Sequence, residues 1–200
     1  MNDKEFFNNL ADKWDDMGFH SKEKIEYILS KANLKEGDRV LDIGSGTGVL
    51  IPYLENIISN NGNIAAIDIA ENMLKVSKEK NKYSNLKFIV GDFLEYKSKK
   101  TFNCITAYSC YPHFKDKDKL AHRAYELLEE GGRLVIAHSE SKEKINSRHK
   151  DVDHKIKSHI LPKVKYTAEL MEKHNFKTIY TEDNEECYIY IGARKNNLIR

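Results

Sequence analysis

The stretch VLDIGSGTGVL, residues 40–50, decides the fold of this chain, because it joins an apolar run and an aspartate to three closely spaced glycines. Gly44, Gly46 and Gly48 stand on every second residue. Glycine in such a position indicates a backbone that passes close to a neighbour or adopts φ > 0. A glycine-rich turn between a strand and a helix most often cradles a nucleotide. The stretch therefore predicts a ligand site at the carboxyl end of a buried strand.

Strand and helix patterns alternate along the chain on both sides of this turn. Two amphipathic helices precede it, with Phe7 and Trp14 on the apolar stripe of the first. The strands are short apolar runs, as expected for a parallel sheet that carries helices on both faces. Gly131 and Gly132 are predicted to end the last helix of this series, as C-cap glycines do. After the turn we expect helices at 47–59, 70–80 and 119–130, and strands at 64–68, 86–90, 102–108 and 133–138.

The last part of the chain has a different pattern. A predicted helix near residues 167–176 leads into two extended runs around an acidic turn. Ile189 and Ile191 alternate with Tyr188 and Tyr190, which indicates a half-exposed strand. The expected fold is therefore α/β and Rossmann-like, a doubly wound and mostly parallel sheet with an antiparallel hairpin at its edge.

Composition places the chain among globular proteins of one domain. Hydrophobic residues make up 40% and charged residues 32% of the 200 positions, and the formal net charge is +2. This balance gives no argument for nucleic acid or a membrane surface as a partner. Three scattered cysteines form no disulfide framework or metal knuckle. The polar beginning shows no targeting segment and no run is long enough to span a bilayer, so the cytoplasm is the expected location.

Two acids follow the next two predicted strands. Asp68 comes 20 residues after Gly48, where an acidic side chain can accept hydrogen bonds from both hydroxyls of a ribose. Asp92 can accept a hydrogen bond from an adenine amino group, with Met73 or Phe93 against the ring. Both acids have a structural alternative as a helix cap or a turn residue. The glycine pattern is G-x-G-x-G, and Val49 stands where the dinucleotide fingerprint G-x-G-x-x-G has its third glycine.

Five segments in order give the chain a family resemblance. VLDIGSGTG, AAIDIAENML, FIVGDF, FNCITAYSCYPHF and LEEGGRLVIAH resemble the ordered motifs of class I S-adenosylmethionine-dependent methyltransferases. The resemblance covers roughly residues 3–140 and the closing helix and hairpin. It implies a seven-stranded sheet in which the seventh strand lies antiparallel between the fifth and the sixth. It also implies S-adenosylmethionine as cofactor and methyl transfer as activity.

The resemblance assigns cofactor contacts residue by residue. The glycine turn would pass beneath the methionine part of the cofactor, Asp68 would hold the ribose and Asp92 would read the adenine. Asp42 matches an acid that orients the amino end. The full set of expected cofactor residues is Asp42, Gly44, Ser45, Gly46, Thr47, Gly48, Asp68, Ile69, Met73, Asp92, Phe93 and Tyr108.

The methyl acceptor is predicted to be a small molecule. The segment AYSCYPHF differs from the motif of enzymes that methylate adenine or glutamine amino groups. Within it Tyr108 is expected to contact the cofactor and His113 to act as the base, although His113 has an alternative as a loop histidine bound to a carbonyl. No nucleic acid or membrane is expected as partner. The alternatives are an RNA or protein methyltransferase, a nucleotide-binding oxidoreductase and a non-catalytic cofactor-binding subunit.

Residues 141–165 are the most individual part of the sequence. They contain eight basic and three acidic residues. One interpretation is a basic lid over an anionic small molecule, and the other is a solvated charged helix. His149 and Asp153 share a helix face near His138, so a metal site is conceivable but the metal ligands stay unknown.

The domain organisation follows from these assignments. One domain, 1–200, is predicted to consist of capping helices (1–36), a cofactor-binding core (37–140), a lid or substrate segment (141–165) and a closing helix and hairpin (166–200). Trp14 in the capping helices would cover the pocket or pack between helices.

Overall fold

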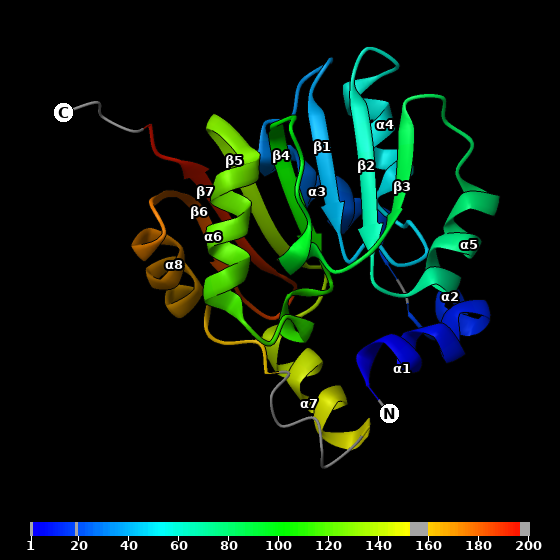
Figure 1. The fold of residues 1–200 in the computed structure, drawn as a ribbon. Helices are drawn as coiled ribbons and strands as arrows, with labels where there is room; N and C mark the ends of the chain where they lie inside the picture. Colours follow the sequence, from blue (N-terminus) through cyan, green and yellow to red (C-terminus); the bar gives the residue numbers. More distant parts are fainter. Residues whose placement is uncertain (1, 19, 153–159, 197–200) are drawn as a thin grey trace.

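The computed structural model describes residues 2–18, 20–152 and 160–196. These residues form a seven-stranded sheet in the order β3-β2-β1-β4-β5-β7-β6 (Figure 1). Neighbouring strands are parallel except that β7 is antiparallel to both β5 and β6. The predicted doubly wound, mostly parallel fold is therefore confirmed, including the antiparallel seventh strand. The strands are β1 (Arg39–Ile43), β2 (Asn63–Asp68), β3 (Leu86–Val90), β4 (Phe102–Tyr108), β5 (Leu128–His138), β6 (Phe176–Asp183) and β7 (Tyr188–Arg194).

Helices cover both faces of the sheet and the end toward which β1, β2 and β4 point (Figure 1). On one face α3 (Lys22–Ala32) and α4 (Ile51–Ile58) pack against the central strands, and on the other lie α6 (Lys117–Leu127) and α8 (Val164–Lys173). The N-terminal elements lie beneath the strand ends beside α5. The remaining elements are α1 (Asp3–Leu10), η1 (Ala11–Lys13), α2 (Trp14–Met17), α5 (Glu71–Lys80), η2 (Phe93–Glu95), η3 (Tyr111–His113) and α7 (Lys142–Val152).

The glycine turn delays the helix that follows β1. The sequence predicts helix from residue 47, but α4 begins at Ile51, with Pro52 in its first turn. Gly44, Gly46 and Gly48 all have positive φ, between 54° and 82°, which is incompatible with a regular right-handed helix. Residues 44–50 therefore form turns that expose backbone groups at the end of the sheet.

The prediction that Gly131 and Gly132 end a helix is wrong. Helix α6 ends at Leu127, and β5 begins at Leu128 and runs through both glycines. The pairing of β4 with β5 changes register here, and Gly131 has φ 74°. A Cβ on Gly132 would lie 2.8 Å from the carbonyl oxygen of Glu129. The glycine pair thus lies at an irregularity of the strand. Such an irregularity needs glycine for the same reasons as a helix end, namely positive φ and close approach of the backbone.

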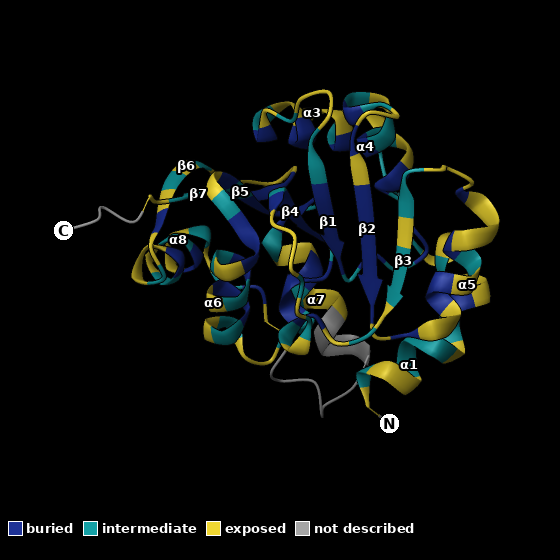
Figure 2. Ribbon diagram, turned by 45° about the horizontal axis from the view of Figure 1, so that its top comes forward, coloured by how far each residue is buried: buried dark blue, intermediate teal, exposed yellow. Residues whose placement is uncertain are grey.

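Strand β7 is buried on both faces, so the prediction of a half-exposed strand is wrong (Figure 2). Tyr188 and Tyr190 belong to the core under α6 and α8, whereas Ile189 and Ile191 belong to the core under α3 and α4. The Tyr188 hydroxyl lies 2.7 Å from Oγ1 of Thr167 on α8, which supplies a polar partner inside that core. Tyrosine and isoleucine therefore alternate because the two faces of β7 pack into two different hydrophobic cores.

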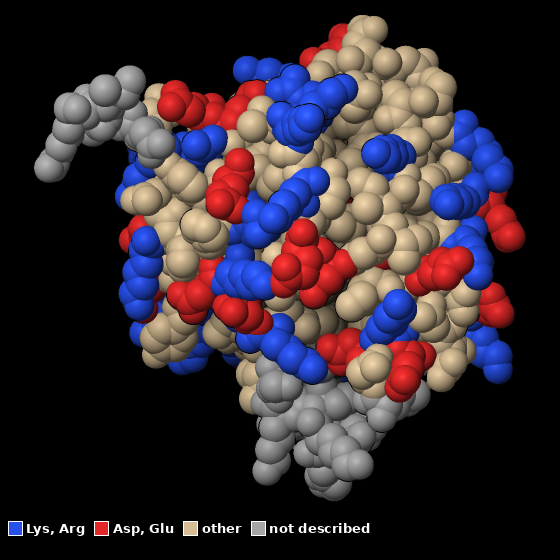
Figure 3. Space-filling model, in the orientation of Figure 1, with Lys and Arg blue, Asp and Glu red and all other residues tan. Residues whose placement is uncertain are grey.

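Among the described residues, no helix is both long enough and apolar enough to cross a bilayer. Basic and acidic side chains are interspersed over the face of the molecule in Figure 3.

The position of β7 between β5 and β6 predicts a large difference between two isoleucines of the hairpin. Ile189 on β7 is fully buried, whereas Ile179 on the edge strand β6 is 44% exposed. We expect Ile189→Ala to lower the free energy of unfolding by about 2–5 kcal/mol. The matched change Ile179→Ala should cost less than about 1 kcal/mol. Urea denaturation of both variants measures this, and equal losses would contradict the central position of β7.

Candidate functional site

A cavity of about 450 Å³ lies at the carboxyl ends of β1, β2 and β4. The chain moves outward from β1 to β2 and β3 and then returns to the other side of β1 with β4, so this is the switch point of the sheet. Ligands of open α/β sheets bind in the crevice at such a point. The glycine turn, the ends of β2 and β4 and the N-terminal helices supply the walls.

The three glycines of the turn meet three different requirements. A Cβ on Gly44 would lie 2.8 Å from Cβ of Cys110, so this glycine lets β1 approach the segment after β4. A Cβ on Gly48 would lie 2.2 Å from Oγ of Ser77 on α5. A Cβ on Gly46 would meet nothing within 4 Å, and Gly46 lines the cavity. Close packing explains the first two glycines, although Gly44 also lines the cavity, whereas a Cβ on Gly46 would enter open space.

Asp68, at the end of β2, ties the glycine turn to the next helix. Its Oδ2 accepts a hydrogen bond of 2.8 Å from the backbone N–H of Gly46, and its Oδ1 accepts one of 2.8 Å from Ala70. Burial raises the pKa of this carboxyl, and the hydrogen bonds from the backbone oppose that shift. A carboxylate has about four lone-pair positions, so these two bonds leave acceptor capacity on the cavity side. The structural role of a turn residue and the predicted ribose contact are thus compatible.

Asp42 is buried beneath the turn and does not line the cavity. Its Oδ1 accepts a hydrogen bond of 2.7 Å from the hydroxyl of Thr106 on β4. Burial raises the pKa of Asp42 to about 7; the Thr106 hydrogen bond opposes this, and the nearby Asp68 charge adds to it. Two carboxyl groups with raised pKa values, Asp42 and Asp68, therefore lie at one end of the cavity.

The far wall, after β3, is apolar with a polar edge. Asp92 accepts a hydrogen bond of 2.9 Å from the backbone N–H of Leu94 and caps η2, which is the structural alternative considered for it. It also lines the cavity, together with Met73 and Phe93. Both of these side chains are buried, so they give the cavity an apolar wall to which Asp92 adds a carboxylate.

The N-terminal helices close the cavity by contacts with the turn and with α5. The Thr47 hydroxyl donates a 2.6 Å hydrogen bond to Asp15, and the same aspartate forms an ion pair with Lys80. Trp14 packs near Met73 and also lines the cavity, so both of its predicted roles hold. The ring of Phe7 contacts Trp14 edge-on, with centroids 5.3 Å apart.

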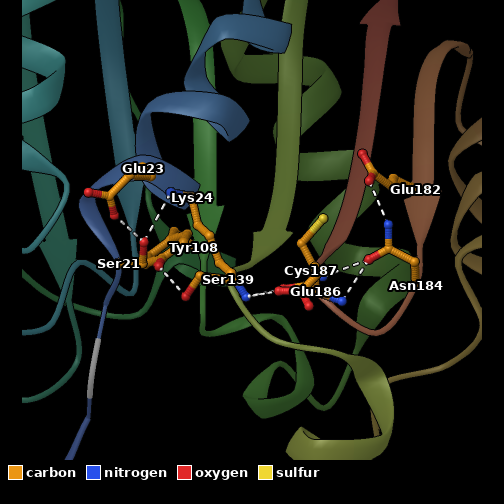
Figure 4. Close-up of polar contacts among 9 residues, drawn as sticks. All are labelled: Ser21, Glu23, Lys24, Tyr108, Ser139, Glu182, Asn184, Glu186 and Cys187. Carbon is orange, nitrogen blue, oxygen red and sulfur yellow. Dashed lines mark hydrogen bonds and ion pairs between the residues drawn. The ribbon is translucent and has the colours of Figure 1, made fainter.

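A chain of polar contacts crosses the opposite wall. The Tyr108 hydroxyl donates a 2.7 Å hydrogen bond to Oγ of Ser139, after β5 (Figure 4). Nδ1 of His20 lies 3.0 Å from the same hydroxyl. Burial raises the pKa of Tyr108 to about 12, so its proton stays in place. His113, predicted as the base, also lines the cavity, with its ring 5.1 Å from the ring of Phe7.

The structure brings most of the predicted residues to one cavity. Asp42 and Gly48 are the two predicted contacts that lie behind its wall. Lining residues that sequence analysis missed include His20 and Lys115, which no motif marks, and Cys110, which lies inside the segment FNCITAYSCYPHF but received no role. The predicted residues that line the cavity are Gly44, Ser45, Gly46, Thr47, Asp68, Ile69, Met73, Asp92, Phe93, Tyr108 and His113.

The basic segment 141–165 is described in part. Ile145 of α7 and Leu161 are buried against the core, and Asn146 exchanges two hydrogen bonds with the backbone of Leu161. None of the described residues of this segment lines the cavity, so the lid stays a prediction. Asp153 and the side chain of His149 fall outside the described part of the structure. Within that part, no cluster of three or more histidine, cysteine or acidic residues could hold a metal ion.

Comparison with known proteins gives one family. A family profile described as a methyltransferase domain matches residues 34–184. Ubiquinone/menaquinone biosynthesis C-methyltransferases of Vibrio cholerae and Escherichia coli are 30% identical over 141 and 142 residues, which is 65% of this chain in each case. The alignments cover 54% and 56% of those proteins, so the chain spans about half the length of the curated relatives it matches.

Solved structures share the fold. A SAM-dependent methyltransferase of Aquifex aeolicus superposes with a TM-score of 0.72 at 17% identity, covering 97% of this chain and all of that one. The partner of the Trm112 methyltransferase activator in a complex from Haloferax volcanii gives 0.76 at 16% identity, covering 95% and 98%. Phosphoethanolamine N-methyltransferase 2 of Haemonchus contortus, in complex with S-adenosylmethionine, gives 0.72 at 19% identity, covering 88% and 53%.

The cavity fits the cofactor of this family. Ser45 Oγ is buried in the cavity wall and has no hydrogen-bond partner among the described residues, so it is available to a polar ligand group. The open space at Gly46 admits a ligand next to the backbone, and Asp68 keeps acceptor capacity for hydroxyls. The apolar wall with Asp92 suits a purine ring. These features match an amino acid joined to a nucleoside.

The different surroundings of two glycines predict separable effects on stability and ligand binding. Gly48→Ala should lower the free energy of unfolding by about 2–4 kcal/mol, since a methyl group collides with α5 and φ is 82°. Gly46→Ala should cost about 1 kcal/mol, because only the positive φ is unfavourable. The second variant should nevertheless bind S-adenosylmethionine at least tenfold more weakly. Urea denaturation and calorimetry measure the two effects, and normal donor affinity of Gly46→Ala would contradict the ligand site.

The raised pKa of Asp42 predicts a pH dependence of stability. An unfolded aspartate titrates near pH 4, whereas Asp42 in the native protein titrates at about 7, so the native state holds more protons between these values. The Asp42 contribution to stability is therefore fully present below about pH 4 and is lost as the pH rises to about 7. Asp42→Asn keeps an oxygen for the Thr106 hydroxyl and should remove this dependence. Denaturation at several pH values measures the wild-type minus variant difference, and a constant difference would contradict the assignment.

Proposed function

We propose, from the premise that the chain belongs to the class I S-adenosylmethionine-dependent methyltransferase family, that it transfers a methyl group to a small-molecule acceptor. The protein is a methyltransferase with S-adenosylmethionine as its cofactor. When bound, this cofactor supplies a methyl carbon activated by a sulfonium. The proposal adds the class of the methyl acceptor, a small molecule.

The enclosure of the cavity by the N-terminal helices carries the proposal. Phe7 and Trp14 cover the end of the sheet, and the contacts of Asp15 with Thr47 and Lys80 hold that cover against the turn. A cavity of about 450 Å³ lies in the range of small-molecule sites and must hold both reactants. Such an arrangement suits a small acceptor and excludes water from the reacting atoms.

We assign the cofactor contacts as the sequence predicts them, except that Gly48 packs against α5 and Asp42 takes a different role. Asp68 would accept hydrogen bonds from the ribose hydroxyls, and Asp92 with Phe93 would bind the adenine. Ser45 and the backbone at Gly46 would face the amino-acid end. Asp42 would act from behind the wall, through its charge.

On the acceptor side, Tyr108 and His113 face the remaining space of the cavity. Lys4 and Lys115 line the cavity and are exposed, and they would pair with negative charge on an acceptor, whereas Asp3 adds one negative charge to the same lining. The curated relatives are, by name, C-methyltransferases of ubiquinone and menaquinone biosynthesis, which supports a small acceptor. Positioning of donor and acceptor in such a site contributes up to about 7–11 kcal/mol to catalysis.

Methyl transfer from labelled donor tests the proposal. The full chain is incubated with S-adenosylmethionine labelled in the methyl group and, separately, with catechol, thiophenol, bulk transfer RNA or casein. We expect label only in the small-molecule arms. Label confined to the RNA or casein arm would replace the small acceptor by a macromolecule. Transfer in no arm, together with retained donor binding, would favour a non-catalytic cofactor-binding subunit.

A matched pair of acid variants tests the donor site. Asp68→Asn removes the charge that would bind the ribose and should weaken donor binding at least tenfold, since hydrogen bonds to a charged group contribute about 1.5–3 kcal/mol each. Asp38→Asn changes a half-buried acid outside the cavity that accepts a hydrogen bond from the backbone of Lys35, and this variant should bind the donor normally. Calorimetry with S-adenosylmethionine measures both, and equal affinities would remove Asp68 from the site.

A further inference from the structure

His20 lies in the linker between α2 and α3 and lines the cavity, although no sequence motif marks it. The position of this linker is fixed on its C-terminal side. Ser21 caps α3 by accepting a hydrogen bond from the backbone N–H of Lys24. The Lys24 ammonium binds both the carbonyl oxygen and the carboxylate of Glu186 in the turn between β6 and β7, at 2.9 and 2.7 Å (Figure 4). The histidine is thus held directly before the capped start of α3.

The hydrogen bonds of Tyr108 determine which nitrogen of His20 carries the proton. The Tyr108 hydroxyl has one proton, and it donates that proton to Oγ of Ser139. Its oxygen can then serve only as an acceptor toward Nδ1 of His20, 3.0 Å away. Nδ1 must therefore carry a hydrogen, and in a neutral imidazole Nε2 is left as the unprotonated, basic nitrogen.

We propose that His20 is the general base of the proposed methyl transfer, acting through Nε2, and that Tyr108 and Ser139 are positioning residues that fix its tautomer. The inference rests on the proposed function and deepens it, because a base matters only when the reacting atom of the acceptor carries a proton. It therefore assigns the acceptor to the protic class, with a phenol, enol or thiol as the reacting group.

The proposed step balances as follows. The acceptor atom forms a bond to the methyl carbon while the bond from that carbon to sulfur breaks, and the electron pair of the broken bond stays on sulfur. The proton of the acceptor atom moves to Nε2 of His20, which becomes an imidazolium. The sulfur thereby loses its positive charge and the histidine gains one. Solvent takes the proton from the histidine after the products leave.

The surroundings of His20 keep it neutral before the reaction. Burial lowers its pKa, and the positive charges of Arg148 and Lys80 act in the same direction. Glu140 and Asp15 raise the pKa and limit the shift. The resulting base is unprotonated at neutral pH, as a proton acceptor must be. His113 then contacts the acceptor through its ring, next to Phe7.

Nitrogen-15 NMR of the imidazole rings tests the tautomer in the intact protein. At pH 7.5 we expect His20, assigned by its loss in His20→Gln, to show the neutral form with hydrogen on Nδ1. Ser139→Ala removes the acceptor of the Tyr108 proton, so Tyr108 can donate to Nδ1 and the hydrogen should move to Nε2. A wild-type His20 that is charged, or that carries its hydrogen on Nε2, would overturn the proposal.

Turnover separates the base from the proposed function. With labelled donor and catechol or thiophenol, His20→Gln should lower kcat by 10²–10⁴-fold with little change in donor affinity, whereas His113→Gln should mainly raise the KM of the acceptor. Ser139→Ala should shift the pH profile of kcat. Unchanged kcat in His20→Gln would exclude His20 as the base and leave the methyltransferase intact. Absence of turnover in the wild type would count against the small protic acceptor, and the NMR result would then apply to the histidine alone.

Discussion

The carboxylate of Asp68 holds the functional end of this protein together. By accepting the backbone N–H groups of Gly46 and Ala70, it fixes the turn after β1 against the turn after β2. A buried carboxylate is stable there only because both oxygens receive hydrogen bonds. The shape of the cavity floor follows from this one side chain, and so does the direction in which the backbone of the glycine turn faces the ligand.

The cover of the cavity depends on the same turn. Thr47 is part of the glycine turn, and its hydroxyl binds Asp15 of the N-terminal helices, which also pairs with Lys80 of α5. Asn8 adds two hydrogen bonds to Asn72 at the start of α5. A ligand that orders the turn thereby supports the cover. The turn and the cover are thus joined by direct contacts between neighbouring residues.

Local patterns predicted the sheet and most of the cavity, because strands, turns and their terminal acids are encoded within short stretches. The bounds expected for β3 and β4 agree with the structure, and the acids Asp68 and Asp92 lie at the cavity. Contacts between residues far apart in the sequence could not be predicted from such patterns. The position of His20 depends on Tyr108, 88 residues away, and the burial of β7 depends on helices from two distant parts of the chain. Gly131 looked like a helix cap because positive φ serves strands and helix ends alike.

Charge explains why two acids can share this end of the sheet. Asp42 and Asp68 are both buried, and the charge of one makes ionisation of the other less favourable. Without a positive charge nearby, the ionised form of each acid is therefore unfavourable. A ligand with a sulfonium and an ammonium stabilises the ionised forms, whereas a thioether product supplies only the ammonium. We therefore expect the acids to bind the reactant more strongly than the product, which would favour exchange after each methyl transfer. The same loss of positive charge at sulfur accompanies the gain of a proton at His20, so the site as a whole keeps its net charge through the step.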